Sequence, residues 1–325
     1  MKKIRWGIVG PGNIARKFAK AVKNVEKAEL YAVASRSVER SSAFAAEFGI
    51  PKVFSSYEEM AASPEVDAVY IATAHPFHKP CAEIFLNAKK HVLCEKPVCI
   101  NAKDATALYE CAKKNGVFLM EAMWSRFLPA IIEAQRLVAS GEIGEVVSVS
   151  ADFCYSMEKD EEPKVFDRNL AGGSILDVGI YPINFACFFS GYDVKTVKSY
   201  CRVEDGVDTH AVITLGFENG VTAVGTSALI SAKPESGYIY GRKGYIYIPV
   251  FYGAQKLYVY KDGAEAVIEK PSIGEGFEEE IIECCRCISL GKTESDIHPM
   301  TDSIKVLKIM DEARAQNGVI YPSEV

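Results

Sequence analysis

The chain has 325 residues, of which 49% are hydrophobic and 25% charged, and its formal net charge is -6 at pH 7. This length exceeds one ordinary hydrophobic core, so we expect two domains, and the composition is that of a globular protein. The net negative charge argues against a broad nucleic-acid surface. We also expect no signal peptide and no apolar run long enough to span a membrane.

The first part of the chain alternates short β-rich runs with helical stretches. Runs with the length of buried parallel strands lie at Ile4–Val9, Leu30–Ala34, Ala68–Thr73 and His91–Cys94. Helix-like segments lie at Ile14–Lys23, Val38–Phe48, Pro80–Ala88 and Ala102–Asn115. Repeated strand–helix–strand units predict a doubly wound parallel sheet, so we expect a dinucleotide-binding Rossmann domain over residues 1–122 and an α/β protein overall.

Residues 123–325 have a different pattern, which predicts an α+β domain on a mostly antiparallel open sheet. A helical stretch at Ser174–Phe189 precedes β-rich runs at Val197–Val203, Ala211–Phe217, Thr222–Ala228, Gly237–Tyr240, Tyr245–Val250 and Lys256–Tyr260. Turn signals such as Asn219-Gly220 separate these runs and indicate hairpins. Helical stretches at Phe277–Ser289 and Thr301–Gln316 close the chain. An open apolar sheet face favours a homodimer or higher homo-oligomer through this domain, which we also expect to bind substrate.

The ten cysteines are scattered along the chain, which does not suggest a disulfide framework. We expect them to be reduced in a cytoplasmic protein. The one cluster, Cys284-Cys285-Arg286-Cys287, lacks a second Cys or His pair nearby to complete four zinc ligands. We therefore interpret it as small residues on a helix and expect no metal.

A glycine-rich loop follows the first predicted strand. Its sequence, Gly10-Pro11-Gly12-Asn13-Ile14-Ala15, is a GxGxxA form of the dinucleotide fingerprint. Gly10 permits a tight turn, Gly12 lets backbone N–H groups approach a pyrophosphate, and Ala15 lets helix and strand pack closely. The following helix would offer its N-terminus to the anion, so we expect Gly10, Gly12, Asn13 and Ile14 to bind the cofactor.

The residues at the end of the second predicted strand indicate which dinucleotide binds. An NAD-preferring protein usually has Asp or Glu there, but this chain has Ser35-Arg36, with Arg40 one helical turn later. Arginines pair well with a 2′-phosphate and stack on adenine. We therefore predict that Ser35, Arg36 and Arg40 bind NADP, with NAD less favoured.

Polar side chains follow two further strands, at the sheet edge where ligands bind in doubly wound folds. Thr73, His75 and His78 follow the Ala68–Thr73 run. Two histidines three apart could bind a metal, but no carboxylate or cysteine completes the ligand set, so hydrogen bonds to cofactor or substrate are the favoured interpretation. Glu95 and Lys96 follow the next run, and Pro97 restricts Lys96 to an extended conformation that would aim its ammonium into the cleft.

A glycine-rich stretch, Ala171–Tyr181, carries a second set of polar groups. In a helix Asp177 and Tyr181 lie four residues apart on one face, and Gly179 between them permits close approach of a ligand or backbone. A tyrosine can act as general acid when a nearby cation lowers its pKa. By itself such a pair is more often an ordinary polar helix face.

Five stretches, in order over nearly the full length, resemble the family containing glucose–fructose oxidoreductase and inositol dehydrogenase. They are Val33–Ser37, His75–Lys79, Val92–Pro97, Phe118–Phe127 and Ala171–Tyr181. Most of that family has His at the place of Tyr181. The branch of dimeric dihydrodiol dehydrogenase and NADP-dependent D-xylose dehydrogenase has Tyr, and this chain looks most like that branch. Asn184 stands where many relatives have Asp, which puts their substrate contacts in doubt.

The resemblance implies catalytic roles for Lys96 and Tyr181. It also implies a pocket for a sugar-like or diol substrate, lined by His78, Trp124, Phe153, Arg168 and Asp177. We expect Tyr181 to exchange a proton with the substrate oxygen and Lys96 to stabilise the tyrosinate, while NADP(H) binds at Glu95, Lys96, Thr73, His75 and the glycine loop. A dinucleotide-binding sensor without turnover is the alternative, and retention of Lys96 and Tyr181 favours an enzyme. A biliverdin-reductase-like enzyme shares the fold but has less reason to keep this pair.

Overall fold

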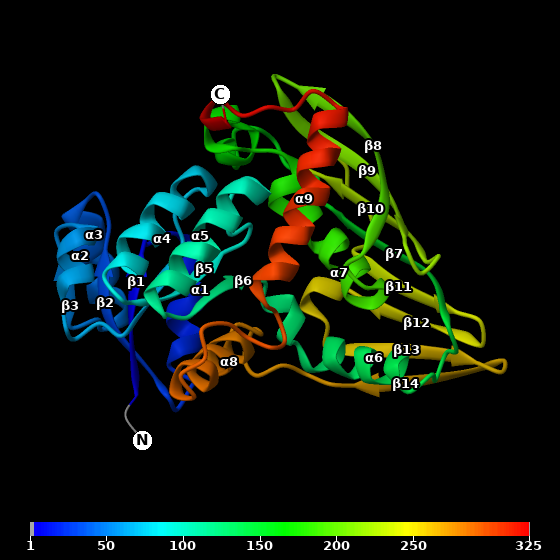
Figure 1. The fold of residues 1–325 in the computed structure, drawn as a ribbon, viewed down its shortest axis with the longest axis horizontal. Coiled ribbons are helices and arrows are strands. Elements are labelled where there is room, and N and C mark those ends of the chain that lie inside the picture. Colours follow the sequence, from blue (N-terminus) through cyan, green and yellow to red (C-terminus); the bar gives the residue numbers. More distant parts are fainter. Residues whose placement is uncertain (1–2, 325) are drawn as a thin grey trace. The chain divides into compact units, whose positions relative to one another are not determined.

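The computed structural model describes residues 3–324 and divides the chain into two compact units (Figure 1). One unit comprises Met1–Trp124 and Ile273–Ile304, and the other comprises Ser125–Ser272 and Lys305–Val325. The boundary predicted at residue 122 lies beside the observed one. The assignment of Ile273–Ile304 to the second domain is corrected, because this segment belongs to the first unit.

The first unit contains six parallel strands in the order β3-β2-β1-β4-β5-β6. The strands are β1 Ile4–Val9, β2 Ala28–Ala34, β3 Lys52–Phe54, β4 Ala68–Ile71, β5 His91–Glu95 and β6 Leu119–Ala122. The connecting helices are α1 Asn13–Val22, α2 Val38–Phe48, α3 Tyr57–Ala62, α4 His78–Asn87 and α5 Ala102–Asn115. This strand order is that of the dinucleotide-binding doubly wound fold, and it confirms the predicted Rossmann domain.

Aromatic side chains hold α1 on the sheet. Phe18 of α1 stacks on Tyr70 of β4 with ring centroids 3.9 Å apart, and Trp6 of β1 meets the Phe18 ring edge-on at 5.5 Å. All three side chains are fully buried. The packing fixes α1, and therefore the glycine loop that precedes it, against the first and fourth strands.

Helix α8 (Glu278–Ser289) explains why the segment near residue 280 joins the first unit. Its apolar face, which includes Ile281, Cys284 and Cys285, is buried and packs against α1 and β2. Cys284, Cys285 and Cys287 are all buried on this helix, which confirms the interpretation of the cluster as small residues on a helix. Sequence periodicity alone did not show which sheet this helix would cover.

The second unit contains an eight-stranded sheet in the order β14-β13-β12-β11-β7-β10-β9-β8. Its strands are β7 Val146–Cys154, β8 Val194–Glu204, β9 Val207–Phe217, β10 Thr222–Ala228, β11 Ser236–Gly241, β12 Gly244–Pro249, β13 Lys256–Lys261 and β14 Ala264–Glu269. Neighbours pair antiparallel except β10 with β7, which are parallel. The predicted mostly antiparallel sheet is confirmed.

Helices cover one face of this sheet. Helix α7 (Ile180–Ser190) packs on β7 and β10, α6 (Pro129–Ala139) packs on β13, and the second half of α9 (Met300–Gln316) packs on β8, where Ser199 Oγ donates to the Ala313 carbonyl (Figure 1). The covered face is apolar. Its residues in β11 to β13 are the buried Ile239, Ile246, Ile248, Leu257 and Val259.

The helical stretch Arg168–Ser190 is long and apolar enough to cross a membrane when judged only by length and composition, with a mean hydropathy of 1.2. In the structure 89% of its most apolar 18-residue segment is buried inside the fold. Its apolar character is therefore used in covering β7 and β10. An apolar stretch of this length was not expected from the sequence.

Replacing Phe18 with alanine tests the aromatic packing of the first unit. We expect a loss of about 3–5 kcal/mol in the free energy of unfolding, because the change removes a fully buried ring and leaves a cavity between Trp6 and Tyr70. Urea denaturation measures it. Val38→Ala, at an exposed position of α2, is the control and should change the free energy by about 0.5 kcal/mol or less. Equal effects of the two changes would contradict this account of the core.

Candidate active site

The glycine loop leaves the N-terminus of α1 open. Gly10 has φ +88°, and a Cβ there would lie 2.9 Å from the Ala72 carbonyl oxygen, so the turn requires glycine. Helix α1 starts at Asn13 without a side-chain cap, so its first N–H groups have no partner from a capping side chain. A Cβ on Gly12 would meet nothing within 4 Å. The loop therefore fits the pyrophosphate of a dinucleotide, since donors and open space lie together there.

A hollow of about 150 Å³ lies beyond the ends of β2 and β3. It is lined by Ser35, Arg36, Ser55, Ser56, Tyr57 and Glu58. Burial raises the pKa of Tyr57, and the positive charges of Arg36 and Arg40 oppose that shift, so both guanidinium groups act on this tyrosine. The hydroxyl of Ser35 lies 2.8 Å from both the Ser37 carbonyl and Ser41 Oγ, which fixes the turn. Arg36 thus lines a hollow rich in hydroxyl groups, and the charge of Arg40 acts on the tyrosine in its lining.

Ser55, Ser56 and Tyr57 were missed by the sequence analysis. They follow β3, a strand of only three residues, which is too short to give a periodic signal. The signal that could have found them is their place directly after an apolar Val53-Phe54 pair, at the edge where strands of a parallel sheet end.

The loop after β4 places the two histidines differently. His78 is buried, with Nδ1 2.8 Å from the Pro97 carbonyl oxygen and Nε2 2.9 Å from the Thr73 carbonyl oxygen. Burial lowers the pKa of His78, and these two carbonyl groups oppose that shift. Nδ1 therefore links the loop after β4 to the turn after β5, while Nε2 faces a carbonyl group of its own loop. His75 is half-buried, with its ring 5.8 Å from that of His78.

Glu95 and Lys96 lie at the end of β5. Glu95 is buried; its carboxylate accepts a hydrogen bond from the Tyr70 hydroxyl and a second, at 3.2 Å, from the Lys96 backbone N–H. Burial raises the pKa of Glu95 to about 7, although the Tyr70 hydrogen bond and the charge of Lys96 oppose the shift. An acid that changes charge near neutral pH therefore lies beside the backbone of the predicted catalytic lysine.

A second buried acid, Glu280, lies on α8. Glu280 is fully buried, and within residues 3–324 neither of its carboxyl oxygens has a hydrogen-bond partner. Burial raises the pKa of Glu280 well above its ordinary value, and the charge of Glu95 adds to the shift. Burial therefore favours the neutral form of Glu280, because an unpaired buried charge is far costlier than a buried neutral acid.

Glu121 also supports the turn after β5, and the sequence analysis did not single it out. Its carboxylate accepts hydrogen bonds from the Val98 N–H at 2.9 Å, Ser303 Oγ at 2.7 Å and His298 Nε2 at 3.1 Å. Burial by itself would raise the pKa of Glu121, but these donors bring it below its ordinary value. Glu121 therefore fixes the backbone two residues after Lys96.

Tyr181 lies among aromatic rings in the second unit. It is buried on α7, with its ring centroid 5.3 Å from Phe153 and 5.8 Å from Tyr252. Phe153 and Tyr252 are stacked on each other at 4.0 Å, and the Tyr252 hydroxyl donates to Glu235 at 2.8 Å. The phenol of Tyr181 is thus held by rings from β7 and from the turn after β12.

Asp177 belongs to the same neighbourhood. Its carboxylate accepts a hydrogen bond of 2.6 Å from the Tyr155 hydroxyl, and the Tyr155 ring meets Phe153 edge-on. Residues Ile175–Gly179 form a π-helical turn that leads into α7. Such turns occur often at functional sites. The structure therefore brings together three of the predicted residues, namely Asp177, Tyr181 and Phe153.

Two predicted substrate residues have other surroundings. Arg168 is exposed, and its Nε donates to the Ile320 carbonyl at 2.9 Å near the C-terminal end of the chain. Trp124 is half-buried and stacks on Phe277 in the first unit, with centroids 5.1 Å apart. Neither contact depends on the aromatic group around Tyr181.

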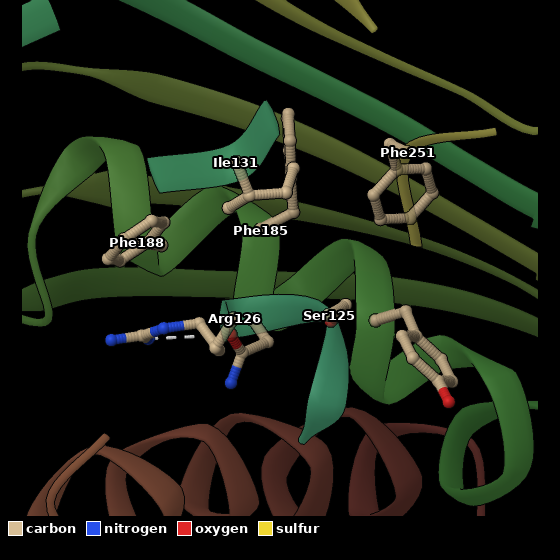
Figure 2. A pocket seen from close by; sticks show the side chains of 8 residues that line it. Ser125, Arg126, Ile131, Phe185, Phe188 and Phe251 are labelled. Atoms are coloured by element: carbon tan, nitrogen blue, oxygen red, sulfur yellow. Dashed lines mark hydrogen bonds between the residues drawn. The ribbon is translucent and has the colours of Figure 1, made fainter. Parts of the chain in front are cut away.

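A small apolar pocket lies beside α7 (Figure 2). Its lining residues are Ser125, Arg126, Ile131, Tyr181, Asn184, Phe185, Phe188 and Phe251. Its cavity volume is about 10 Å³, close to the room that one water molecule needs. Arg126 stacks on Phe188 at 3.9 Å and donates to Asn184 Oδ1 at 3.5 Å. Asn184 thus takes part in a buried contact with Arg126.

The open N-terminus of α1 in a sheet of Rossmann order, followed by an α+β unit, is typical of a two-domain dinucleotide-binding protein. The family model for the oxidoreductase family with NAD-binding Rossmann fold matches residues 4–123, and that for the GFO/IDH/MocA C-terminal domain matches residues 131–247. The chain belongs to the GFO/IDH/MocA family of NAD(P)-dependent oxidoreductases. The resemblance stated from the sequence is thereby confirmed.

Relatives match over nearly the whole chain. The chain is 36% identical to trans-1,2-dihydrobenzene-1,2-diol dehydrogenase of Danio rerio and 35% identical to scyllo-inositol 2-dehydrogenase (NADP(+)) of Bacillus subtilis, with 99% of each chain covered. A crystal structure of aldose–aldose oxidoreductase from Caulobacter crescentus with glycerol has a TM-score of 0.90 and 28% identity, covering 98% of both chains. A 3-ketoreductase from Actinomadura kijaniata with NADP and TDP-benzene has a TM-score of 0.87 and 26% identity, covering 97% of this chain and 98% of that one.

Proposed function

We propose that this protein transfers a hydride between NADP(H) and the carbinol or carbonyl carbon of a sugar, a cyclic diol or a dicarbonyl. The observation that carries the proposal is the Gly10–Gly12 loop ahead of an uncapped helix, in a chain whose full-length relatives are named as dehydrogenases. The bound dinucleotide would supply or accept the hydride. The protein would bind the substrate, orient it and manage the proton.

Tyr181 and Lys96 are the proposed catalytic residues. Tyr181 would give its phenolic proton to the substrate oxygen during reduction and take it back during oxidation. A phenol ordinarily has a pKa of about 10, so a cation must stabilise the tyrosinate for this exchange to run near neutral pH. Lys96 would supply that charge and orient the oxygen. Structures of the Actinomadura 3-ketoreductase include variants with a lysine replaced by alanine or glutamate and a tyrosine by phenylalanine, the same residue types.

We propose NADP(H) rather than NAD(H) as the cofactor. The support is the hollow beyond β2 and β3, where two arginines and several hydroxyl groups accompany each other and no Asp or Glu ends β2. Arg36 and Arg40 would pair with the 2′-phosphate, with Ser35 holding the turn. Gly10, Gly12, Asn13 and Ile14 would hold the pyrophosphate, and Thr73, His75 and Glu95 would border the nicotinamide half.

The proposed substrate contacts centre on Asp177 and the aromatic rings. A carboxylate accepts hydrogen bonds from hydroxyl groups, and the Phe153 ring can pack on the apolar face of a sugar or cyclic diol. Trp124 and Arg168 remain proposed contacts from the resemblance. For His78 we now favour support of the Lys96–Pro97 turn, because both its nitrogens face backbone carbonyl groups.

A homodimer or higher homo-oligomer is proposed to form through the uncovered face of the second unit's sheet. This face carries stacked pairs of half-exposed tyrosines on β11, β12 and β13: Tyr238 with Tyr247, Tyr245 with Tyr260, and Tyr247 with Tyr258. The exposed Val224 and Tyr200 continue it across β10 and β8. Exposed aromatic and aliphatic side chains on one sheet face favour contact with a second copy of the chain. A cytoplasmic location goes with the proposal, because all ten cysteines have free thiols.

Replacing Tyr181 with phenylalanine tests the central proposal. We expect kcat to fall by about 10²–10⁴-fold, because the proton donor is lost, while the Kd for NADPH changes by less than about twofold. The assay is loss of NADPH absorbance with a panel of aldoses, keto-sugars and α-dicarbonyls. Tyr200→Phe, on the exposed sheet face of the same unit, is the control with unchanged kcat. Wild-type turnover by the Tyr181 variant would remove this residue from its role.

The cofactor preference is tested with Arg36→Leu and Arg40→Leu. Each change should raise the Kd for NADPH by about 10–100-fold, since a hydrogen bond to a charged group contributes about 1.5–3 kcal/mol. The Kd for NADH, which lacks the 2′-phosphate, should stay within about twofold. Fluorescence titration of both cofactors measures this. A parallel loss for NADH would show that the arginines do not read the phosphate.

The assembly is tested by placing a charge on the uncovered face. The double variant Val224→Arg and Tyr247→Arg should sediment as a monomer, because burying unpaired guanidinium groups against a second copy is costly. Leu290→Arg, an exposed apolar position of the first unit, is the matched control and should leave the oligomer intact. Analytical ultracentrifugation distinguishes the species. A wild-type protein that is already monomeric, or an unchanged oligomer in the double variant, would count against the proposal.

A further inference from the structure

A buried aspartate of β9 holds the start of the helix that carries Tyr181. Asp208 is fully buried, and its Oδ2 accepts a hydrogen bond of 2.7 Å from the Ile175 N–H and one of 3.0 Å from Ser174 Oγ. The N-terminal end of a helix has unpaired N–H groups and a partial positive charge. A carboxylate in this place satisfies the first of them and anchors the helix to the sheet.

The residues around Asp208 are closely packed. Gly173 has φ +131°, and a Cβ there would lie 2.2 Å from Asp208 Oδ1, so the backbone runs directly against the carboxylate. On the other side Ser174 Oγ lies 3.0 Å from Ser227 Oγ of β10. A Cβ on Gly179 would in turn lie 3.0 Å from the same Ser227 oxygen. Strands β9 and β10 therefore both touch the first turn of the helix.

The turn held in this way is the π-helical one. Residues Ile175–Gly179 form it, Asp177 lies inside it, and Tyr181 is the second residue of α7 that follows. A π turn is less favourable than an α turn and persists where surrounding contacts impose it. A change at the anchored end would alter the winding of this turn and so the direction of the Tyr181 side chain.

We propose that Asp208 is a positioning residue for Tyr181, acting through the N-terminus of its helix and required in its ionised form. The inference rests on the proposed function of Tyr181 as proton donor. Asp208 would not touch substrate or cofactor. Its carboxylate would keep the π turn wound so that the phenol stays in its productive orientation.

The carboxyl group of Asp208 changes charge near pH 6. Burial raises the pKa of Asp208 to about 6, while the Ile175 N–H, Ser174 and the charge of Arg314 on α9 oppose the shift. The other titratable groups that face it are Tyr321, whose pKa burial raises well above its ordinary value, and Cys201 of β8, whose pKa burial raises to about 12. Neither changes charge between pH 5 and 8, so Asp208 is the group here that does.

The upward shift of the Asp208 pKa means that the ionised form of this residue does not stabilise the fold. The pKa of Asp208 is higher in the folded protein than its ordinary value, so the folded state binds the proton more tightly than the unfolded state. Stability therefore falls as the pH rises from about 4 to about 6, because the unfolded state ionises before the folded state, and this contribution stays level above pH 6. A group kept only to stabilise the fold would not be needed in its charged form.

The test is Asp208→Asn, which keeps the size and one acceptor oxygen but removes the charge. We expect kcat to fall by about 10–100-fold, as a displaced catalytic group would cause, with the Kd for NADPH unchanged. The melting temperature at pH 7.5 should not fall. In wild type kcat should decline below pH about 6, and this decline should be absent from the variant. Wild-type kcat in the variant, or a retained decline at that pH, would overturn the proposal.

Two companion measurements make the outcome specific. Ser174→Ala removes one neutral donor and keeps the charge, so its kcat should stay within about fivefold of wild type and its pH profile should be unchanged. Hydrogen exchange at the Ile175 amide should be faster in Asp208→Asn, and unchanged exchange would refute the anchor. This readout needs no activity. Full turnover by Tyr181→Phe would refute the proposed function, whereas unchanged exchange at Ile175 refutes the anchor alone.

Discussion

Buried carboxyl groups that accept backbone N–H groups hold both segments in which we place the catalytic residues. Glu95 accepts the N–H of Lys96, Glu121 accepts that of Val98, and Asp208 accepts that of Ile175. A buried carboxylate is costly unless it is hydrogen-bonded, and so is a buried N–H group, so each partner fixes the other. The backbone of these segments is thereby set without use of the lysine and tyrosine side chains, which carry the proposed chemistry.

Four of the buried acids, Glu95, Glu121, Asp208 and Glu280, have pKa values that shift differently, and the set of hydrogen-bond donors around each accounts for the difference. All are at least nine-tenths buried, so loss of hydration acts on each in the same direction. Glu121 accepts three hydrogen bonds and its pKa is lowered; Asp208 and Glu95 accept two each, and their pKa values rise to about 6 and about 7. Glu280 has no hydrogen bond within residues 3–324, and burial raises its pKa well above its ordinary value. Donor count, rather than depth, orders these acids.

Local signals predicted the fold where the chain supplies its own boundaries. Helices α2 and α5 have the predicted ends, because Ser37 and Asn101 cap their starts and Gly49 and Gly116 end them in the left-handed conformation. Six other elements were not predicted, and one of them, the six-residue helix α3, was missed although Ser56 caps its start. The six are β3, α3, β6, α6, β7 and β14. The placement of α8 in the first unit was also missed, since its buried face shows that it packs but not against which sheet.

The candidate site likewise contains residues that a local motif predicts and residues that only the finished fold brings together. The glycine loop and the Arg36 turn were predictable because a dinucleotide is bound by backbone geometry and charge at fixed places in a local motif. The buried contacts of His78 with Pro97, of Glu121 with Val98 and of Asp208 with Ile175 were not, since each joins residues 19 or more positions apart and depends on the finished fold. Substrate selection belongs to the second kind. It depends on rings such as Phe153 and Tyr252, which come from separate strands and turns and meet only after folding. The cofactor can therefore be argued from sequence, whereas the substrate has to be argued from the packing around Tyr181.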